Sequence, residues 1–277
     1  MRLGGPVSIP EMTPGAWVDA HREMGYRAAL CPCTSDDDTT TVEAFASAAR
    51  AADILIAEVG AWSNPLSPDP DERARALEQC KTQLALAERV GASCCVNISG
   101  SRGQPWDGPH PDNLTPETFD MVVASVREII DAVKPDTATY ALEPMPWMYP
   151  HTSDNYLALL EAVDRPAFAV HIDMVNVINS PEKYFANGEL IREWFGKLGP
   201  RIVSCHAKDT LISTQLTTHL SEVRAGLGHL DYATLLREIN KLGPDIPLII
   251  EHLATQEEYA LSAAYIRSVA AEVGVPL

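Results

Sequence analysis

The stretch Phe168-Ala-Val-His-Ile-Asp-Met-Val-Asn176 decides the fold of this chain. Its near-continuous apolar residues predict a strand buried on both faces, as in a parallel sheet covered by helices. Asp173 stands at the C-terminal end of this run, where a carboxylate has no role in an apolar core. Three further predicted strands end in polar residues in the same way: Tyr140-Ala-Leu-Glu143, Ile202-Val-Ser-Cys-His206 and Leu248-Ile-Ile-Glu251.

Apolar strand candidates alternate with helix candidates along all 277 residues. This alternation predicts a parallel sheet with crossover helices, and we expect an α/β fold, a (β/α)8 TIM barrel built as a single domain by residues 1–277. An open doubly wound sheet is the alternative, but Gly4-Gly5-Pro6 lacks the spacing of its glycine-rich phosphate turn. In barrels, catalytic groups project from the C-terminal ends of strands. The four terminal polar residues fall there.

Composition limits the partners of the chain. The 21 Lys and Arg residues against 38 Asp and Glu give a net charge of −17, which argues against nucleic acid or an anionic membrane as partner. No secretory signal pattern and no apolar run of membrane-spanning length occurs, so we expect a cytoplasmic protein. The cysteines have neither zinc-site nor disulfide-framework spacing and are interpreted as reduced core thiols: Cys31, Cys33, Cys80, Cys94, Cys95 and Cys205.

Glu143, Asp173, His206 and Glu251 would repel one another at one barrel end unless a cation compensated. A divalent metal resolves this. An oxygen-rich set with one nitrogen suits Mn²⁺, Mg²⁺ or Co²⁺ better than structural zinc, although Zn²⁺ can also occupy such a site. Such an ion can bind a substrate carbonyl and adjacent hydroxyl and stabilise an enediolate, while a glutamate on either side of the substrate moves the proton. The alternative is that each residue makes a separate salt bridge.

Other residues at or after strand ends are expected to line the pocket, although packing within a loop explains any one of them equally well: Glu58, Trp62, Asn97, Arg102, Trp106, His110 and Trp147. Residues 100–111 form a connection long enough to act as a lid. His171 alternates with Asp173 along the strand. We interpret it as a hydrogen-bonded core histidine rather than a residue that supports a metal ligand.

Nearly the whole chain resembles the xylose isomerase-like superfamily of sugar isomerases and epimerases. The segments that carry this resemblance are Ala141-Leu-Glu-Pro144, His171-Ile-Asp173, Ser204-Cys-His-Ala-Lys-Asp209, Arg224-Ala-Gly-Leu-Gly-His-Leu-Asp-Tyr232 and Ile249-Ile-Glu251. The resemblance implies metal ligation by Glu143, Asp173, His206 and Glu251, with the two glutamates as catalytic acid and base. It places Arg224 in a turn that approaches substrate. A keto-sugar or cyclic keto-polyol is the implied substrate, and we also expect a homo-oligomer.

Two positions depart from ketose 3-epimerases, which usually carry His where this chain has Asn176 and Arg where it has Ile212. The His-Ala-Lys-Asp sequence is more similar to the branch with inosose dehydratases, which makes a lyase an alternative. Lys208 would bind a substrate oxygen or pair with Asp209, and Asn176 is a further candidate for substrate contact. The catalytic subunits of C-glycoside deglycosidases, which cleave 3-oxo-glucosides and work with a small β-rich subunit, are also similar.

Two other functions compete with proton transfer beside a carbonyl. An apurinic-site endonuclease on the same barrel would need additional His and Asp ligands and a basic DNA groove, against which the acidic composition argues. A sugar-binding barrel without turnover is the non-enzymatic alternative, because metal ligands alone do not establish catalysis.

Overall fold

The computed structural model describes residues 1–277. Its main sheet is a closed barrel with the strand order β1-β10-β7-β6-β5-β4-β3-β2, which confirms the expected (β/α)8 fold. The barrel strands are β1 (Arg2–Gly4), β2 (Ala28–Leu30), β3 (Leu55–Gly60), β4 (Cys94–Asn97), β5 (Thr139–Leu142), β6 (Phe168–Ile172), β7 (Ile202–Ala207) and β10 (Pro247–Ile250).

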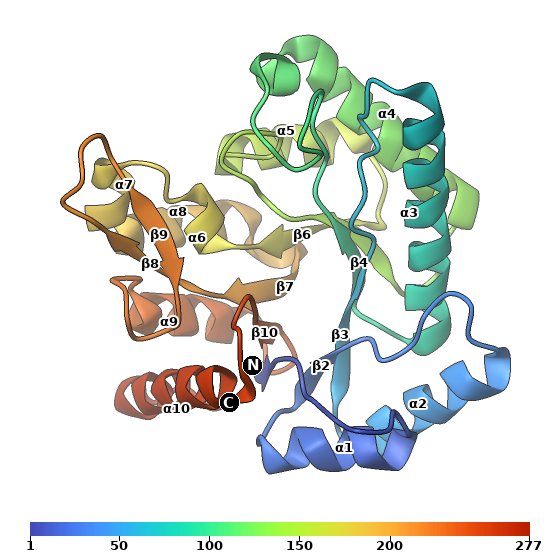
Figure 1. Ribbon diagram of the computed structural model, residues 1–277, viewed down its shortest axis with the longest axis vertical. Coiled ribbons are helices and arrows are strands. Elements are labelled where there is room, and N and C mark those ends of the chain that lie inside the picture. The colour runs from blue at the N-terminus through green and yellow to red at the C-terminus, as the bar shows by residue number, and fades with distance from the viewer. The chain divides into compact units, whose positions relative to one another are not determined.

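The chain forms two compact units. The first unit comprises residues 1–30, 48–55 and 172–277, and the second comprises residues 31–47 and 56–171. The helices are α1 (Pro14–Glu23), α2 (Thr39–Ala51), α3 (Pro70–Val90), α4 (Pro116–Val133), α5 (Ser153–Val163), α6 (Met174–Val177), α7 (Pro181–Phe185), α8 (Asn187–Leu198), α9 (Tyr232–Leu242) and α10 (Gln256–Val273) (Figure 1), with short 3-10 turns at Pro111–Leu114 and Gly199–Arg201. None of them is both long and apolar enough to cross a bilayer.

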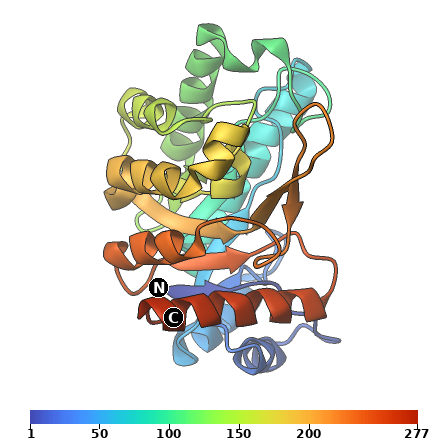
Figure 2. The ribbon, with the colours of Figure 1, turned by 90° about the vertical axis from the view of Figure 1, so that its left-hand side faces the viewer.

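In the first unit, α8, α9 and α10 lie side by side along the strands (Figure 2). β7 and β10 pair in parallel, with His206 opposite Ile249. On the other side of β10, β1 approaches β2 closely at Gly4, where an added Cβ would lie 2.2 Å from the carbonyl oxygen of Ala28. Only glycine therefore fits this position.

In the second unit, β4, β5 and β6 form a parallel ladder, and α3 and α4 pack together (Figure 1). Tyr156 of α5 fixes the ends of two strands through its hydroxyl, which donates to Leu142 O at 2.6 Å and accepts from the amide of His171 at 3.2 Å. This contact holds the residue before Glu143 and the residue two before Asp173. All six cysteines are free, and all but the half-buried Cys31 are buried.

The structure adds elements that the sequence analysis did not predict. Two short strands, β8 (Asp209–Ile212) and β9 (Leu220–Val223), form an antiparallel hairpin after β7 (Figure 1). The short helices α6 and α7 follow β6. β3 continues through Gly60, so Glu58 lies inside this strand rather than at its end. The hairpin strands alternate weakly in polarity and are partly exposed, and a sequence pattern of that kind does not distinguish them from a loop.

Asp209 holds the turn that follows this hairpin. Its carboxylate is 1% exposed and accepts hydrogen bonds from four backbone amides at 2.8–3.1 Å, those of Thr210, Gly226, Gly228 and Leu230. A Cβ at Gly228 would lie 2.3 Å from Asp209 Oδ1. The glycines of the turn thus let backbone amides converge on one buried carboxylate, and hydrogen bonds to an ionised acceptor are the strong ones.

We therefore expect Asp209→Asn to destabilise the protein by about 3 kcal/mol, because the amide group would place a donor against backbone donors and leave buried groups unpaired. Urea unfolding measures this effect as a lower midpoint with an unchanged slope. Asp120→Asn, on the exposed face of α4, serves as the control. Equal midpoints for the two variants would contradict this role of Asp209.

Candidate metal centre

The predicted ligands all lie at strand ends. Glu143 directly follows β5 and Asp173 directly follows β6, while His206 is the next-to-last residue of β7 and Glu251 directly follows β10. Three of these residues, Asp173, His206 and Glu251, belong to the first unit. Each offers one ligand atom, and the three atoms lie within 4.8 Å of one another. The first unit alone thus assembles a set of two carboxylates and one imidazole.

Asp173 is oriented by the start of a helix. It is the N-cap of α6, and its Oδ1 accepts hydrogen bonds from the amides of Val175 at 2.9 Å and Asn176 at 3.1 Å. Its other oxygen, Oδ2, is buried and accepts no hydrogen bond of good geometry. The backbone therefore fixes one oxygen of Asp173 and leaves the second directed to the cluster.

Lys208 lies in the middle of this cluster. Its Nζ is 2.8 Å from Asp173 Oδ2 and 2.5 Å from Glu251 Oε1, and its side chain is 2% exposed. The Tyr232 hydroxyl donates to the backbone oxygen of Lys208 at 2.7 Å and fixes its main chain. Of the two roles expected for Lys208, pairing with Asp209 is not what the structure shows, because Asp209 uses its oxygens for the backbone amides of the turn.

Positive charge governs the ionisation of both carboxylates. Burial by itself would raise the pKa of Asp173, but Lys208, His206 and the α6 amides hold this pKa well below its usual range. Burial would likewise raise the pKa of Glu251, and His206 and Lys208 lower it to about 2. Both groups are therefore carboxylates at neutral pH.

A second layer of charged groups surrounds Glu251. Its Oε1 is 2.8 Å from His206 Nδ1, and its Oε2 is 3.6 Å from Nε2 of the neighbouring His252. His252 also faces Glu222 of β9 through Nδ1 at 3.1 Å, and this hydrogen bond raises the pKa of His252. The backbone of His252 is left-handed, with φ of 59°. This conformation is uncommon for a residue with a side chain, and it turns the chain immediately after Glu251.

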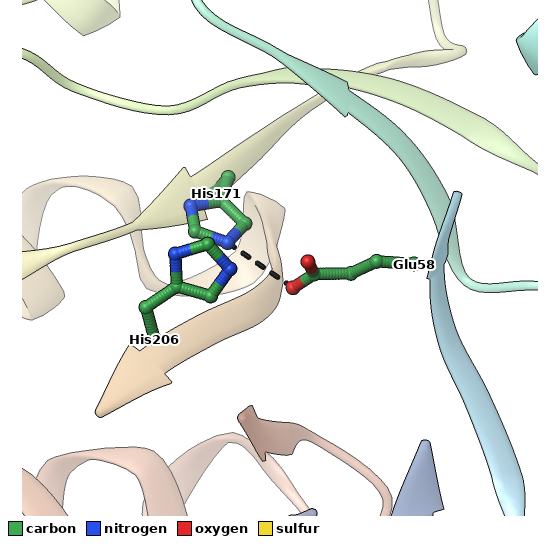
Figure 3. A group of neighbouring side chains, drawn as sticks. All are labelled: Glu58, His171 and His206. Atoms are coloured by element: carbon green, nitrogen blue, oxygen red, sulfur yellow. Dashed lines mark hydrogen bonds and ion pairs between the residues drawn. The ribbon is translucent and has the colours of Figure 1, made fainter. Parts of the chain in front are cut away.

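The second unit holds Glu143, a predicted ligand, and a buried pair of side chains. The backbone amide of Glu143 donates to Asn97 O at 2.8 Å, and its side chain is buried. In the same unit, His171 Nε2 lies 3.1 Å from Glu58 Oε1, with both side chains almost fully buried (Figure 3). His171 thus contacts a carboxylate, the partner expected both for a hydrogen-bonded interior histidine and for a histidine that supports a metal site, and its role stays a prediction.

The remaining candidates have contacts of their own within the loops. Trp147 donates from Nε1 to Asp107 O at 2.8 Å, and the carbonyl of Trp106 accepts from the amide of Ser101. His110 accepts from the amide of Asp112 and caps a short 3-10 turn. Arg224 donates to the neighbouring Ala225 O at 3.2 Å. These contacts explain how the loops are held, and substrate contact by these residues stays a prediction.

The donor set fits a divalent cation. The two oxygens directed into the cluster, Asp173 Oδ2 and Glu251 Oε1, are buried and lack hydrogen bonds of good geometry, although both are within ion-pairing distance of Lys208. Buried anionic oxygens without hydrogen bonds are suited to a cation. Asp173, His206 and Glu251 would hold it through carboxylate oxygens and one imidazole nitrogen. Oxygen ligands of this kind are the type that Mg²⁺ and Mn²⁺ prefer.

Sequence reasoning did not identify Glu222 and His252 as neighbours of the centre, nor the position of Lys208 between the carboxylates. The adjacency of His252 to Glu251 was a visible signal. Glu222 gave none, because its place depends on the hairpin that brings β9 beside β8.

Solved structures share this fold across almost the full chain. A xylose isomerase-like protein from Mycobacterium smegmatis in complex with magnesium has a TM-score of 0.67 and 17% identity, covering 95% of this chain and 90% of that one. D-psicose 3-epimerase with D-tagatose from Clostridium cellulolyticum H10 has a TM-score of 0.70 and 14% identity, covering 100% of both chains. A probable 3-DHS dehydratase from Bacillus anthracis has a TM-score of 0.71 and 15% identity, covering 97% and 98%.

No curated protein matches the sequence. The family profile described as xylose isomerase-like TIM barrel, in contrast, matches residues 18–269. This match spans every barrel strand except β1, and it includes all four predicted ligands and the cluster around Lys208. The chain belongs to the xylose isomerase-like TIM barrel family.

Proposed function

We propose that this protein is a divalent-metal-dependent enzyme that moves a proton on the carbon beside the carbonyl of a keto-sugar or cyclic keto-polyol. The observation that carries the proposal is the convergence of Asp173, His206 and Glu251 on one buried point. Glu143, at the end of β5, is proposed as the fourth ligand. The structural relatives named above, one with magnesium and one an epimerase with D-tagatose, support both the metal and the substrate class.

The residues divide the work by their chemistry. When bound, a divalent ion would act as a Lewis acid toward the substrate carbonyl. Asp173 is fixed by two backbone amides and serves to hold the ion rather than to move protons. Glu143 and Glu251 can each present one oxygen for binding and keep the other for a proton, so we assign them the roles of acid and base. His206 as a ligand has no lone pair left for that task.

Water exclusion around this chemistry is supported by burial. The side chains of His206 and Lys208 are 1% and 2% exposed, and Glu251 is the more open member at 14%. Exclusion of water protects the reactive intermediate during each turnover, while the glutamates exchange their protons with solvent between turnovers. Removal of the proton by one glutamate and delivery of a different proton to the opposite face by the other gives an epimer. Transfer of a proton to a neighbouring hydroxyl, which then leaves as water, gives dehydration, the reaction named for one structural relative.

The proposal predicts exchange of a substrate proton with solvent. Metal-stripped protein supplied with Mn²⁺ and a panel of keto-sugars and inososes in deuterated water should place deuterium on the carbon beside the carbonyl, as followed by NMR and mass spectrometry. The products separate epimerisation from loss of water. A sugar that binds without any exchange or product would favour a binding barrel and contradict the enzyme.

The two glutamates should behave differently from the imidazole. Glu143→Gln and Glu251→Gln are expected to keep much of the metal affinity and to reduce turnover by roughly 10²-fold or more, the usual contribution of a positioned acid or base. His206→Ala should lose metal and activity together, as measured by metal content and initial rate. Glu128→Gln, an exposed residue of α4 paired with Lys81, is the matched control and should leave both unchanged.

In deuterated water, one of the two Gln variants should still exchange the substrate proton without completing the reaction if the glutamates act on opposite faces. Full turnover by both variants with metal bound would show that the acid and base are other residues.

A further inference from the structure

We propose that Lys208 is a stand-in cation, whose ammonium neutralises the ligand oxygens in the metal-free protein and moves to Glu222 when the metal binds. This inference rests on the proposed metal site and adds a step to it, the exchange of one cation for another. Three observations support it. Lys208 contacts the oxygens of Asp173 and Glu251 that face the cluster, its backbone is hydrogen-bonded to Tyr232, and a further carboxylate, that of Glu222, lies nearby.

Only one oxygen of Asp173 can bind the metal without loss of backbone hydrogen bonds. Its Oδ1 is held by two backbone amides, those of Val175 and Asn176. The oxygen directed to the centre is Oδ2, and Lys208 Nζ lies 2.8 Å from it. A metal ion that binds Asp173 without unwinding the start of α6 must therefore take the oxygen that Lys208 now contacts.

Glu251 presents the same competition. Its Oε1 lies between Lys208 Nζ at 2.5 Å and His206 Nδ1 at 2.8 Å, while Oε2 faces outward to His252. An ion shared by Asp173, His206 and Glu251 would thus share two oxygens with the ammonium. Metal–oxygen bonds are about 2.0–2.3 Å long, which would put two positive centres within about 5 Å in a buried site. The repulsion favours displacement of Lys208.

Glu222 is placed to receive the displaced ammonium. Its Oε2 is 3.7 Å from Lys208 Nζ, and its side chain is 36% exposed, much more than Asp173 or Glu251. The main chain of Lys208 is held by Tyr232, so the exchange needs only side-chain rotation. After the move, the ammonium would stand between the metal centre and β9 and could donate to a substrate oxygen, the other role expected for Lys208.

The test is the Mn²⁺ affinity of metal-stripped protein measured by calorimetry. Removing the competing cation in Lys208→Met or Lys208→Gln should lower the Kd by about tenfold or more. Lys241→Met, which removes an exposed lysine of α9, is the control and should leave the Kd unchanged. Circular dichroism checks that each variant is folded. If Lys208→Met does not fold, Lys208→Gln, which removes the charge but keeps a polar side chain with hydrogen-bond donors, and Glu222→Gln are measured in its place.

A double-mutant cycle of Lys208 and Glu222 distinguishes movement of the Lys208 ammonium to Glu222 from a direct effect of the Glu222 charge on the metal. Glu222→Gln should raise the Kd severalfold in the wild-type background, because the carboxylate proposed to receive the Lys208 ammonium is then neutral. In the Lys208→Met background, the same change should have no effect. An equal effect in both backgrounds would mean that Glu222 acts on the metal as a plain negative charge, and the exchange would be refuted.

The outcomes also distinguish this inference from the proposed function. Equal Mn²⁺ affinity of wild type and Lys208→Met, or a weaker affinity of the variant, would overturn the stand-in role and leave the metal site intact. Absence of Mn²⁺ binding by wild type together with tight binding by Lys208→Met would support it strongly. Absence of binding by all variants would refute the metal site and this inference together.

Discussion

The burial of two adjacent carboxylates, Asp173 and Glu251, is the constraint on which the rest of the centre depends. Two anions removed from water repel each other and lose solvation, so the fold must supply positive charge or hydrogen-bond donors at the same place. It does so with the imidazole of His206, the ammonium of Lys208 and the first amides of α6. A site that needs this much compensation without metal is well matched to a divalent ion.

One segment at the end of β7 supplies two of these groups. His206 is the next-to-last residue of β7 and Lys208 directly follows this strand, and both side chains contact Glu251 Oε1. Asp209, the first residue of β8, instead accepts hydrogen bonds from four backbone amides, those of Thr210, Gly226, Gly228 and Leu230. In the sequence Cys205-His-Ala-Lys-Asp209, His206 and Lys208 thus belong to the candidate metal centre, and Asp209 stabilises the adjacent turn.

The barrel and the candidate ligands could be predicted from the sequence because both depend on local patterns. Buried strands followed by polar residues are visible in one dimension, and parallel strands bring their C-terminal ends to one side of a barrel. The partner of Lys208 was not accessible in this way. Its contacts with Asp173 and Glu251 join three different strand ends, and Glu222 depends on an exposed hairpin with no strong pattern. Side-chain pairing across the sheet had to come from the three-dimensional structure.

A divalent metal and Lys208 are proposed to use the same oxygens, Asp173 Oδ2 and Glu251 Oε1. The most direct measurement is a crystal structure with Mn²⁺, located by anomalous scattering at the manganese edge. We predict one manganese ion bound by Asp173, His206 and Glu251, with Lys208 Nζ moved from Asp173 Oδ2 to Glu222. Manganese at another position, or Lys208 still in contact with Asp173 Oδ2 beside a fully occupied ion, would contradict the account.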